Sequence, residues 1–517
     1  MSIDTDQAAY YNAAVDLIDH NLTAGRGHKT AVIDKTGAHS YQELSDNINR
    51  FANALRHIGI LQEQRIILCL NDSIDFPVCF LGAIKAGVIP VPINTRLTEN
   101  DYSFILEDSR AAAIVVSGNL FPLFENHVAS HSALRSVVIS DGATRKYEEL
   151  TGLLSSQSPE FSAAETKADD MCFWLYTSGT TGTPKGTVHL HKNLRATADL
   201  YAVGTLKINE TDVMFSAAKL FFAYGLGNGL TFPFAVGATA ILLEGPPTPE
   251  AVCDILTNHS PTIFFGVPTL FGMLLASDQL PTKEQHELRF CASAGEALPG
   301  DILARWKNHV GVDILDGIGS TEMLHIFLSN RPDDVRPGST GKPVKGYDIR
   351  LTGDDGLPVA QGEMGALEIS GPTSGIMYWN RREKSIETFQ GPWTRAGDKY
   401  RQDKNGYYIY CGRTDDMLKV GGIYVSPFEV EAALIEHEAV LEVAVVGMAD
   451  ADNLIKPKAI IVPKNFDMDL DSLADELKNF VKERLASFKY PRWIEFVDEL
   501  PKTATGKIQR FKLRKMG

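Results

Sequence analysis

Short apolar runs alternate with longer amphipathic stretches along much of the chain. Residues 30–34 and 65–70 have the length and composition of buried strands, and residues 41–58 between them have the apolar spacing of a helix. A second helical stretch, residues 76–87, precedes a further strand at residues 112–116. Strands separated by helices at this spacing predict βαβ units and a mostly parallel sheet.

The same rhythm resumes later in the chain and then changes. Apolar runs at residues 212–215 and 262–265 are again separated by helix-length segments, which extends the α/β pattern. From about residue 343, apolar and polar residues alternate between glycine turns, as in residues 366–369 and 407–410. This alternation is typical of a small antiparallel sheet with one exposed face.

A polar, glycine-led segment, Gly412–Asp416, separates two apolar segments and is the best candidate for a domain boundary. We therefore predict a large N-terminal body over residues 1–412 and a small, mobile C-terminal domain over residues 413–517. The length of 517 residues agrees with this division, because one hydrophobic core cannot organise so long a chain. The predicted fold class is α/β: mostly parallel sheets flanked by helices, a small antiparallel sheet subdomain, and an α+β C-terminal domain.

The composition narrows the class of protein. A hydrophobic fraction of 44% and a charged fraction of 22% are typical of a soluble globular protein. The net charge of −15, without any basic block, argues against nucleic acid or an anionic membrane surface as the main partner. The six cysteines are dispersed, which is typical of a reduced, cytoplasmic protein without a cysteine metal site.

The sequence also predicts no secretion signal and no stable membrane association. The chain starts with acidic residues and lacks the apolar core of a signal peptide there. The longest apolar stretches, residues 76–93 and 231–243, are interrupted by Lys85 and by Pro233. Neither stretch is therefore expected to span a bilayer.

The candidate chemistry centres on one polar stretch, Tyr176–Gly186, which follows the apolar run at residues 171–175. Its glycines, hydroxyls and Lys185 supply mobile backbone N–H groups, polar donors and a cation, as a polyphosphate ligand requires. Lys185 is preceded by Pro184 and followed by Gly186, so the stretch departs from the nucleoside-triphosphatase loop. An ordinary solvated turn is the alternative, although such a turn would not need so many of these groups.

Six motifs in order along the chain resemble the adenylate-forming superfamily of acyl-CoA synthetases, peptide-synthetase adenylation domains and luciferases. They are Tyr176–Gly186 and residues 293–298, 316–322, 393–398, 412–416 and 501–507. Within the superfamily, residues 216–228 and 323–330 look closest to benzoate-CoA ligases. The resemblance implies an ATP- and Mg²⁺-dependent enzyme that forms an acyl-adenylate and then a thioester with coenzyme A.

The resemblance also implies roles for particular residues at the nucleotide. Glu322 would bind the Mg²⁺ ion, and Thr177 would act with it in catalysis. Asp398 would accept hydrogen bonds from the ribose hydroxyls, and Arg413 would add a charged donor. Each of these residues also has a purely structural alternative. Glu322 could be an acid at the start of a helix, Asp398 a turn aspartate and Arg413 a surface arginine. The further nucleotide-binding residues would be Ser178, Gly179, Thr180, Thr181, Lys185, Gly295, Glu296, Ala297, Asp316, Gly317, Ile318 and Thr321.

The resemblance implies that the C-terminal domain contributes different residues to adenylation and to thioester formation. In the family, the residue matching Lys507 pairs with the carboxylate and the α-phosphate, supplying charge rather than acting as a base. Composition alone favours a solvated terminal lysine, and only the family match reverses this. For thioester formation, the resemblance implies a rotation about a hinge at Asp415 that presents Lys419, Gly421 and Gly422 to CoA. An ordinary turn is the alternative for the two glycines.

The predicted acid pocket is apolar and aromatic. Phe222 and Tyr224 lie close together in the chain, and a flat aryl ring suits walls of this kind. No aspartate lies between Ser216 and Asn228 to neutralise an α-ammonium, which disfavours amino acids as substrates. His325 suits a ligand contact and a core position equally. The predicted substrate-binding residues are Ala218, Phe222, Ala223, Tyr224, Gly225, Gly319, His325 and Ile326.

The sequence leaves benzoate and a substituted benzoate such as anthranilate both open. A second hypothesis is an adenylating enzyme that delivers its aryl group to the thiol of a carrier protein. A third is a nucleotide-binding regulator without catalysis, which the joint presence of Lys507, Glu322 and Asp398 argues against. A homodimer is compatible with the sequence, which does not determine the oligomeric state.

Overall fold

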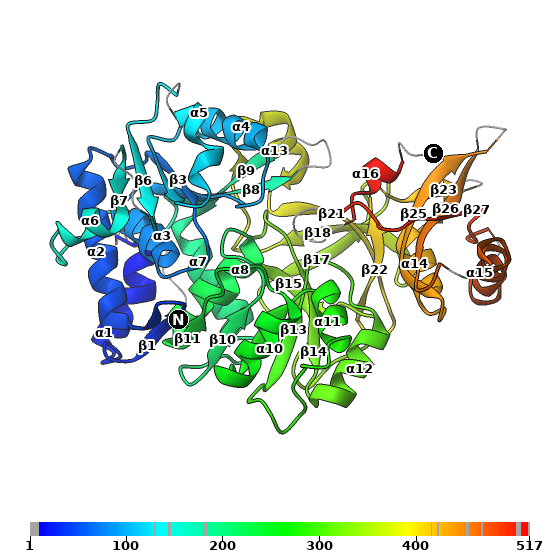
Figure 1. Ribbon diagram of the computed structural model, residues 1–517. Helices are drawn as coiled ribbons and strands as arrows, with labels where there is room; N and C mark the ends of the chain where they lie inside the picture. The colour runs from blue at the N-terminus through cyan, green and yellow to red at the C-terminus, as the bar shows by residue number, and fades with distance from the viewer. Residues whose placement is uncertain are drawn as a thin grey trace. The chain divides into compact units, whose positions relative to one another are not determined.

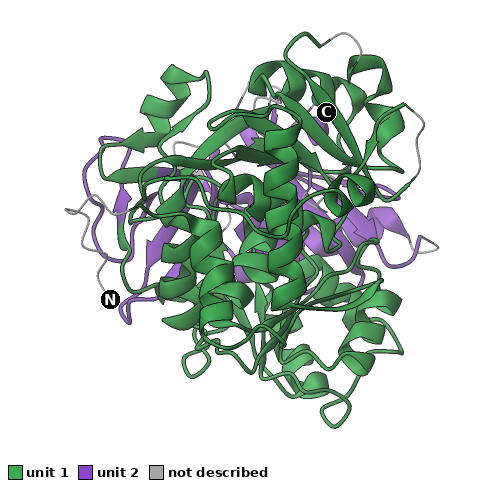
Figure 2. Cartoon of the chain, turned by 90° about the vertical axis from the view of Figure 1, so that its left-hand side faces the viewer, with its two compact units in different colours: residues 1–349, 369–394 green, residues 350–368, 395–517 purple. Residues whose placement is uncertain are grey.

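The structure is a computed structural model of the chain, which divides into two compact units (Figures 1 and 2). The first unit comprises residues 1–349 and 369–394, and the second comprises residues 350–368 and 395–517. The domain boundary expected at Gly412 stays a prediction. The structure describes residues 10–128, 131–142, 146–178, 184–414, 416–420, 423–450, 454–466, 469–486, 488–502 and 508–514.

A nine-stranded sheet organises much of the first unit, in the order β16-β15-β14-β13-β12-β10-β11-β1-β2. The pairs from β1 to β14 are parallel, and the pairs at both edges are antiparallel. The alternation of strands and helices in the sequence is thus confirmed. The strands are β1 (Thr30–Asp34), β2 (Gly37–Ser40), β10 (Val213–Ser216), β11 (Thr239–Ile241), β12 (Ile263–Gly266), β13 (Phe290–Ser293), β14 (Ile314–Gly319), β15 (Ile326–Ser329) and β16 (Lys342–Pro343).

Helices α10 (Pro249–Asn258), α11 (Pro268–Leu275) and α12 (Gly300–Val310) alternate with the parallel strands of this sheet. An aromatic core joins them to it. The rings of Phe264 on β12 and Phe271 on α11 lie 5.4 Å apart between centroids, and Phe271 meets Trp306 of α12 edge to face at 4.8 Å. Large buried rings of this kind contribute strongly to a core because each removes a wide apolar area from water.

A second, fully parallel sheet has the order β4-β3-β5-β6-β7. Helix α2 (Tyr41–His57) begins with a capping box, in which the Ser40 side chain and the Glu43 carboxylate each accept a hydrogen bond from the other residue's N–H. It packs closely on α3 (Asp75–Lys85), since a Cβ added at Gly82 would lie 2.9 Å from the Ile48 carbonyl oxygen. The strands are β3 (Arg65–Cys69), β4 (Ile89–Pro92), β5 (Ala113–Ser117), β6 (Ser136–Ser140) and β7 (Glu148–Glu149).

A third, antiparallel sheet has the order β19-β9-β8 and frames the predicted phosphate loop. Strand β8 (Met171–Ser178) leads into the loop, and β9 (Pro184–Leu190) returns from it. Strand β19 (Met377–Tyr378) pairs with the outer edge of β9. The strand predicted before the loop is therefore present, and the segment after Pro184 is a strand as well.

The second unit carries the antiparallel strands that the later part of the sequence predicted. Strands β21 (Trp393–Gln402) and β22 (Tyr408–Arg413) form one antiparallel pair. Strands β25 (Val440–Ala449), β26 (Ile455–Pro463) and β27 (Trp493–Phe496) form a mixed sheet that packs with helices α14 (Pro427–Ile435) and α15 (Leu470–Arg484). The other elements of this part are β17 (Asp348–Thr352), β18 (Met364–Ser370), β23 (Leu418–Val420), β24 (Ile423–Val425) and α16 (Arg510–Leu513).

Several short elements complete the fold. Three of them, Val15–Asp19, Ala198–Val203 and Gly227–Thr231, are π-helical. The others are α1 (His20–Thr23), α4 (Glu99–Ser109), η2 (Phe121–Leu123), α5 (Glu125–Val128), α6 (Leu150–Ser155), α7 (His191–Thr197), α8 (Ala223–Leu226), α9 (Phe232–Val236), α13 (Arg382–Thr388) and β20 (Phe389–Gln390).

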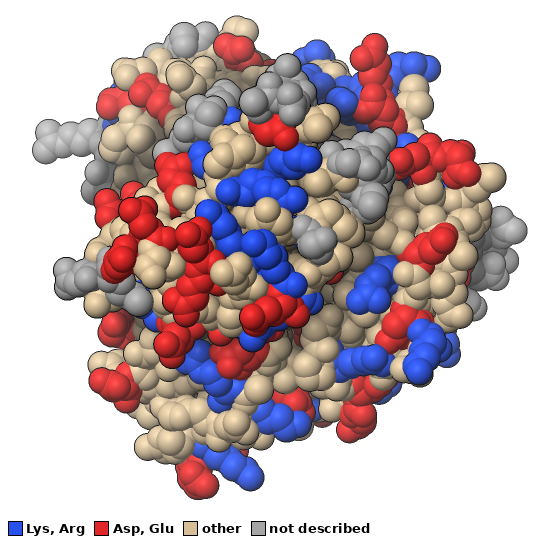
Figure 3. All heavy atoms as spheres, turned by 90° about the vertical axis from the view of Figure 1, so that its right-hand side faces the viewer, with Lys and Arg blue, Asp and Glu red and all other residues tan. Residues whose placement is uncertain are grey.

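The described helices and the surface charges agree with the composition of the chain. Among the described segments, no helix is both long enough and apolar enough to cross a bilayer. Acidic and basic side chains lie side by side on the face shown in Figure 3. The second unit contains ion pairs between such neighbouring side chains. Lys489 pairs with Glu429 at 2.6 Å, and Lys458 pairs with Glu495 at 2.8 Å.

Candidate active site

The turn between β14 and β15 carries Glu322 and is held by its backbone. Each carbonyl of residues 321–323 accepts a hydrogen bond from outside the turn: from His189 Nε2 at 2.8 Å, from the Gly375 N–H at 2.6 Å and from Thr373 Oγ1 at 2.8 Å. Their donors come from β9 and from the segment before β19. The position of Glu322 therefore depends on segments far away in the sequence.

His189 is a buried structural partner of this turn. Burial lowers its pKa to about 4, so the imidazole is neutral at physiological pH. Because Nε2 faces the Thr321 carbonyl, that nitrogen carries the proton, and Nδ1 accepts from Asn193 Nδ2 at 3.2 Å. The ring also stacks on Phe173 of β8 with a centroid distance of 5.1 Å. His189 thus ties the turn to the sheet that frames the phosphate loop.

The Glu322 side chain contacts a residue that the sequence did not single out. Tyr378 Oη donates a hydrogen bond to Glu322 Oε1 at 2.5 Å, and the Lys185 ammonium lies 4.4 Å from the centroid of the same ring. Tyr378 reaches this place because β19 pairs with β9, with Tyr378 opposite Thr187. No spacing rule links the three residues, so only the strand pairing could have found Tyr378.

The base of the phosphate loop is well defined on both strands. Thr177 on β8 lies directly opposite Lys185 on β9. The neighbouring pair, Tyr176 opposite Gly186, is anchored by the Tyr176 hydroxyl, which donates to Asp108 Oδ2 at 2.7 Å. Of the predicted loop residues, Gly179, Thr180 and Thr181 lie outside the described residues, and Ser178 is described in its backbone only.

The segments predicted to wall the adenine follow two neighbouring parallel strands. Ser293 and Asp316 are paired in the register of β13 and β14, so the segments 295–297 and 316–318 lie at the same end of the sheet. Such an end is the usual place for ligands in α/β folds. Glu296 accepts a hydrogen bond from Thr269 Oγ1 at 3.0 Å. Burial raises the pKa of the Asp316 carboxyl well above its usual range, which favours its neutral form.

The predicted acid pocket contains an aromatic enclosure around His325. Its ring lies 5.5 Å from that of Tyr224, 5.5 Å from Tyr201 and 4.5 Å from Phe232. Burial lowers the pKa of His325 to about 3, which keeps the imidazole neutral. Nε2 lies 3.2 Å from the Tyr224 carbonyl oxygen and must donate to it. Within the described part of the chain, Nδ1 of His325 and the Tyr224 hydroxyl have no hydrogen-bond partner.

The other predicted pocket residues lie in the same two segments. Phe222 packs edge to face on Phe221 at 4.5 Å and precedes α8, which begins at Ala223. Gly319 and Ile326 are paired across β14 and β15. Two glycines allow close backbone packing here. A Cβ added at Gly319 would lie 2.4 Å from the His325 carbonyl oxygen, and a Cβ added at Gly225 would lie 2.0 Å from the Lys219 carbonyl oxygen. The carbonyl oxygen of Ala218 would lie 2.4 Å from the Cβ added at Gly225.

Asp398 and Arg413 occupy paired positions in the second unit. They lie opposite each other on β21 and β22, with Arg413 Nη1 3.3 Å from Asp398 Oδ1. The turn before Asp398 contains Gly397 in the left-handed region, at φ 74°. The backbone of Lys419 lies on β23. Asp415, Gly421, Gly422 and Lys507 lie outside the described residues.

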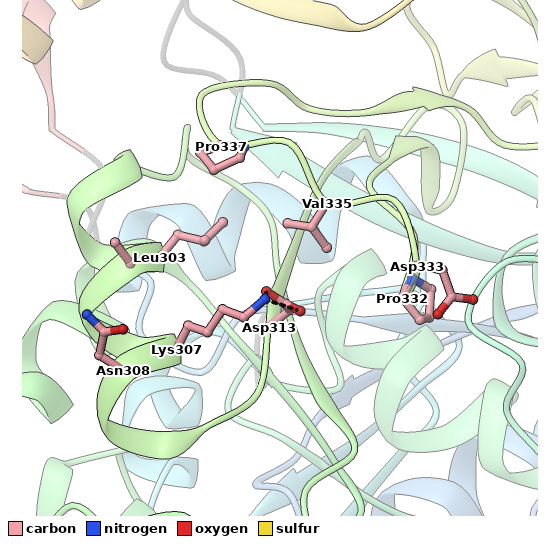
Figure 4. Close-up of a pocket in the computed structure, with 9 residues that line it drawn as sticks. Leu303, Lys307, Asn308, Asp313, Pro332, Asp333, Val335 and Pro337 are labelled. Carbon is pink, nitrogen blue, oxygen red and sulfur yellow. Dashed lines mark hydrogen bonds and ion pairs between the residues drawn. The ribbon is translucent and has the colours of Figure 1, made fainter.

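A surface hollow of about 560 Å³ lies elsewhere in the first unit (Figure 4). Lys307 on α12 points across it to Asp313, with 2.8 Å between ammonium and carboxylate. Leu303, Val335 and Pro337 form its apolar part. The hollow contains none of the predicted site residues, and its Lys307 is paired with Asp313, so we do not assign the chemistry to it.

The site's motifs match known proteins along nearly the whole chain. The family described as AMP-binding enzyme matches residues 19–379, and its C-terminal domain matches residues 429–507. The chain belongs to the AMP-binding enzyme family. A benzoate–CoA ligase from Thauera aromatica is 58% identical over 506 residues, covering 98% of this chain and 96% of that protein. The resemblance expected from the six motifs is confirmed.

Solved structures agree with the fold of this AMP-binding enzyme. A benzoate CoA ligase from Burkholderia xenovorans LB400 has a TM-score of 0.91 and 52% identity, and the match covers 98% of this chain and all (100%) of that one. An anthranilate CoA ligase in complex with anthranoyl-AMP has a TM-score of 0.93 and 43% identity, with 99% and 98% covered. The predicted fold class is therefore confirmed.

The residues of this AMP-binding enzyme suit Mg²⁺ held jointly with a nucleotide. In the described ranges, no group of three or more His, Cys, Asp or Glu side chains is placed to hold a metal ion. Mg²⁺ is commonly bound by one or two carboxylates together with substrate phosphates and water. Glu322 supplies a carboxylate whose Oε1 is fixed by Tyr378, and Thr321 precedes it with a hydroxyl. This donor set fits a phosphate-bound Mg²⁺ ion and does not resemble a closed protein cage.

Proposed function

We propose that this protein is an ATP-dependent aryl-CoA ligase that acts on benzoate or on a benzoate with a small ring substituent. It joins the carboxylate to AMP with release of pyrophosphate, and then transfers the acyl group to the thiol of CoA with release of AMP. The observation that carries the proposal is the neutral aromatic enclosure of Tyr224 and His325, which begins on the turn that holds Glu322. Benzoate and anthranilate ligases are among the proteins most similar to this chain.

Adenylation requires positioning and charge stabilisation more than bond-making groups from the protein. Thr177 and Lys185 face each other at the base of the loop and hold the β- and γ-phosphates, together with the loop residues Ser178–Thr181. Glu322 and Thr321 hold Mg²⁺, which neutralises phosphate charge when bound. The glycine-rich segments 295–297 and 316–318 accommodate the adenine.

The second unit contributes the remaining nucleotide groups in our proposal. Asp398 accepts from the ribose hydroxyls, and Arg413, which lies 3.3 Å from its carboxylate, adds charge and fixes its orientation. Lys507 supplies a cation to the reacting carboxylate and the α-phosphate. For the thioester step, a rotation about Asp415 exchanges Lys507 for Lys419, Gly421 and Gly422, which receive CoA.

The proposed preference for an acid whose only charge is the reacting carboxylate follows from the protonation state of the buried groups. Burial keeps His325 neutral and favours the neutral form of Asp316, so neither side chain suits an α-ammonium or a second carboxylate. Ala218, Phe222 and Ala223 complete an apolar wall. A ring substituent that donates a hydrogen bond, such as an amino or hydroxyl group, has an acceptor of the right kind in His325 Nδ1.

CoA is the proposed acceptor, and a carrier-protein thiol is the alternative. The cytoplasm is the proposed location, which the free state of all six cysteines supports. The assembly state is left open between a monomer and a homodimer.

The proposal is tested with a panel of benzoate, anthranilate, hydroxybenzoates, cinnamates and medium-chain fatty acids, each with ATP, Mg²⁺ and CoA. We expect the highest kcat/KM for benzoate or a monosubstituted benzoate, because an aryl enclosure discriminates through the transition state. A fatty acid as the best substrate would refute the aryl assignment. Replacing CoA by a pantetheinylated carrier protein in the same assay distinguishes the two acceptors.

A further inference from the structure

The hydroxyl and the ring of Tyr378 contact two groups of the nucleotide site at once. The hydroxyl donates to Glu322 Oε1 at 2.5 Å, and the ring face lies against the Lys185 ammonium, 4.4 Å from the centroid. Glu322 comes from the turn after β14 and Lys185 from the strand after the phosphate loop. One aromatic side chain therefore bridges the loop and the carboxylate proposed to hold Mg²⁺.

The placement of Tyr378 is fixed on every side. Its N–H donates to Ser385 Oγ at 2.9 Å, and the same Oγ lies 3.2 Å from its carbonyl. Its ring packs on Phe389 at 5.3 Å between centroids, and the residue is only 3% exposed. A buried phenol held in this way has one orientation, and its hydroxyl holds the acid in turn.

We propose that Tyr378 is a positioning residue for adenylation: its hydroxyl orients the Glu322 carboxylate toward Mg²⁺-bound ATP, and its ring holds Lys185 at the phosphate loop. The proposal rests on the function proposed above. A phenol O–H bonded to a carboxylate is a strong, directional contact. By engaging Oε1, it fixes the rotamer that presents Oε2. The electron-rich ring face attracts the ammonium without forming a covalent or ionic bond to it.

The two contacts are separable by substitution. Tyr378→Phe keeps the ring and its cation contact and removes only the hydroxyl. Tyr41→Phe is the matched control, because the Tyr41 hydroxyl is also buried and donates to a carbonyl, that of Ala238, at 2.6 Å in a remote part of the first unit. Both variants lose one buried phenol hydrogen bond, and only one of them loses it at Glu322.

The first measurement is binding of Mn²⁺ and ATP, followed by the electron paramagnetic resonance signal of free Mn²⁺ without any acid or CoA. We expect Tyr378→Phe to weaken Mn²⁺–ATP binding by about tenfold, the loss typical of one hydrogen bond to a charged group. Tyr41→Phe should bind as the wild type does. Equal binding by Tyr378→Phe and the wild type would overturn the proposal.

A double-mutant cycle distinguishes positioning from general stability. Introduced into Glu322→Gln, the change Tyr378→Phe should alter Mn²⁺–ATP binding by less than about twofold, because the oriented charge is already gone. A tenfold effect that persists in Glu322→Gln would refute the positioning role. Because these assays need no aryl acid, they remain decisive even if the substrate panel shows that the proposed acid is wrong. In turnover assays, Tyr378→Phe should lower kcat and raise the Mg²⁺ concentration for half-maximal rate, with KM for the acid unchanged.

Discussion

Gly375 offers a direct test of how the Glu322 turn is held. Its N–H donates to the Glu322 carbonyl at 2.6 Å, so the two backbones lie in close contact. A methyl group at this position would lie 2.8 Å from Thr187 Cγ2, 3.2 Å from the Val188 carbonyl oxygen and 3.4 Å from the Glu322 carbonyl oxygen. Carbon atoms prefer about 3.5–4.0 Å, so the Gly375→Ala methyl needs a shift of roughly 0.7 Å or more.

Two effects follow from this shift, one on stability and one on rate. Overpacking in a well-packed region costs about 1–3 kcal/mol of folding stability. The strained contacts lie between β9 and the Glu322 turn, so the shift separates the phosphate-loop strand from the carboxylate. A misplacement of about 1 Å in a site of this kind can reduce the rate by about 10². We expect Gly375→Ala to fold and to lose between one and two orders of magnitude in adenylation, which is about 1.4–2.8 kcal/mol.

Carboxylate-dependent pyrophosphate release measures the adenylation rate, and thermal unfolding checks that the variant is folded. Gly272→Ala on α11 is the matched control, because the nearest atom to its added Cβ, Ile302 Cδ1, lies at an ordinary 3.6 Å. That variant should keep its rate, and its thermal midpoint should be unchanged or slightly higher, because alanine is favoured over glycine inside a helix. Wild-type adenylation by folded Gly375→Ala would show that the Glu322 turn does not depend on this contact.

Two further predictions concern the reaction and its pH limits. Lys507→Ala should lose about 10² to 10³ in adenylation and still convert pre-formed acyl-adenylate to thioester, since it removes one charged donor from the first step only; equal losses in both single-turnover assays would contradict this role. His325 has its pKa lowered to about 3 in the folded state, so its contribution to stability is complete above the ordinary pKa of 6.5 and is lost as pH falls toward 3. Between pH 7.5 and pH 5, the wild type should therefore lose about 2 kcal/mol more unfolding free energy than His325→Gln does, as measured by urea denaturation. An unchanged difference would mean that His325 is charged or solvated in the folded protein.

The sequence predicted the elements of the fold better than their assembly. The apolar run at residues 65–70 and the helical pattern at residues 76–87 correspond to β3 and α3 within two residues at each end. Period and length suffice for this because each signal is local. The pairing of β19 with β9 was not predicted, because β19 is two residues long and has no pattern of its own.

The candidate site shows the same division. Lys185 was predicted from the chemistry of its own loop, and the roles predicted for Glu322 and Thr177 were implied by the family resemblance of the motifs in which they lie. Tyr378 was missed because its role depends on a strand pairing between distant segments. The raised pKa of Asp316 could not be predicted either, because it results from burial that only the assembled fold creates.

In the function proposed above, the turn at residues 321–326 joins the two recognition tasks. Glu322 would serve the nucleotide, and His325 would lie in the enclosure for the acid. Between them, Leu324 adopts φ 66°, a left-handed conformation that costs a non-glycine residue about 1–2 kcal/mol. The surrounding backbone hydrogen bonds sustain this strain. Because the backbone between the two side chains is held in this way, we expect a change that shifts the backbone at His325 to displace Glu322 as well. Substitutions aimed at acid specificity on this turn should therefore change kcat as well as KM.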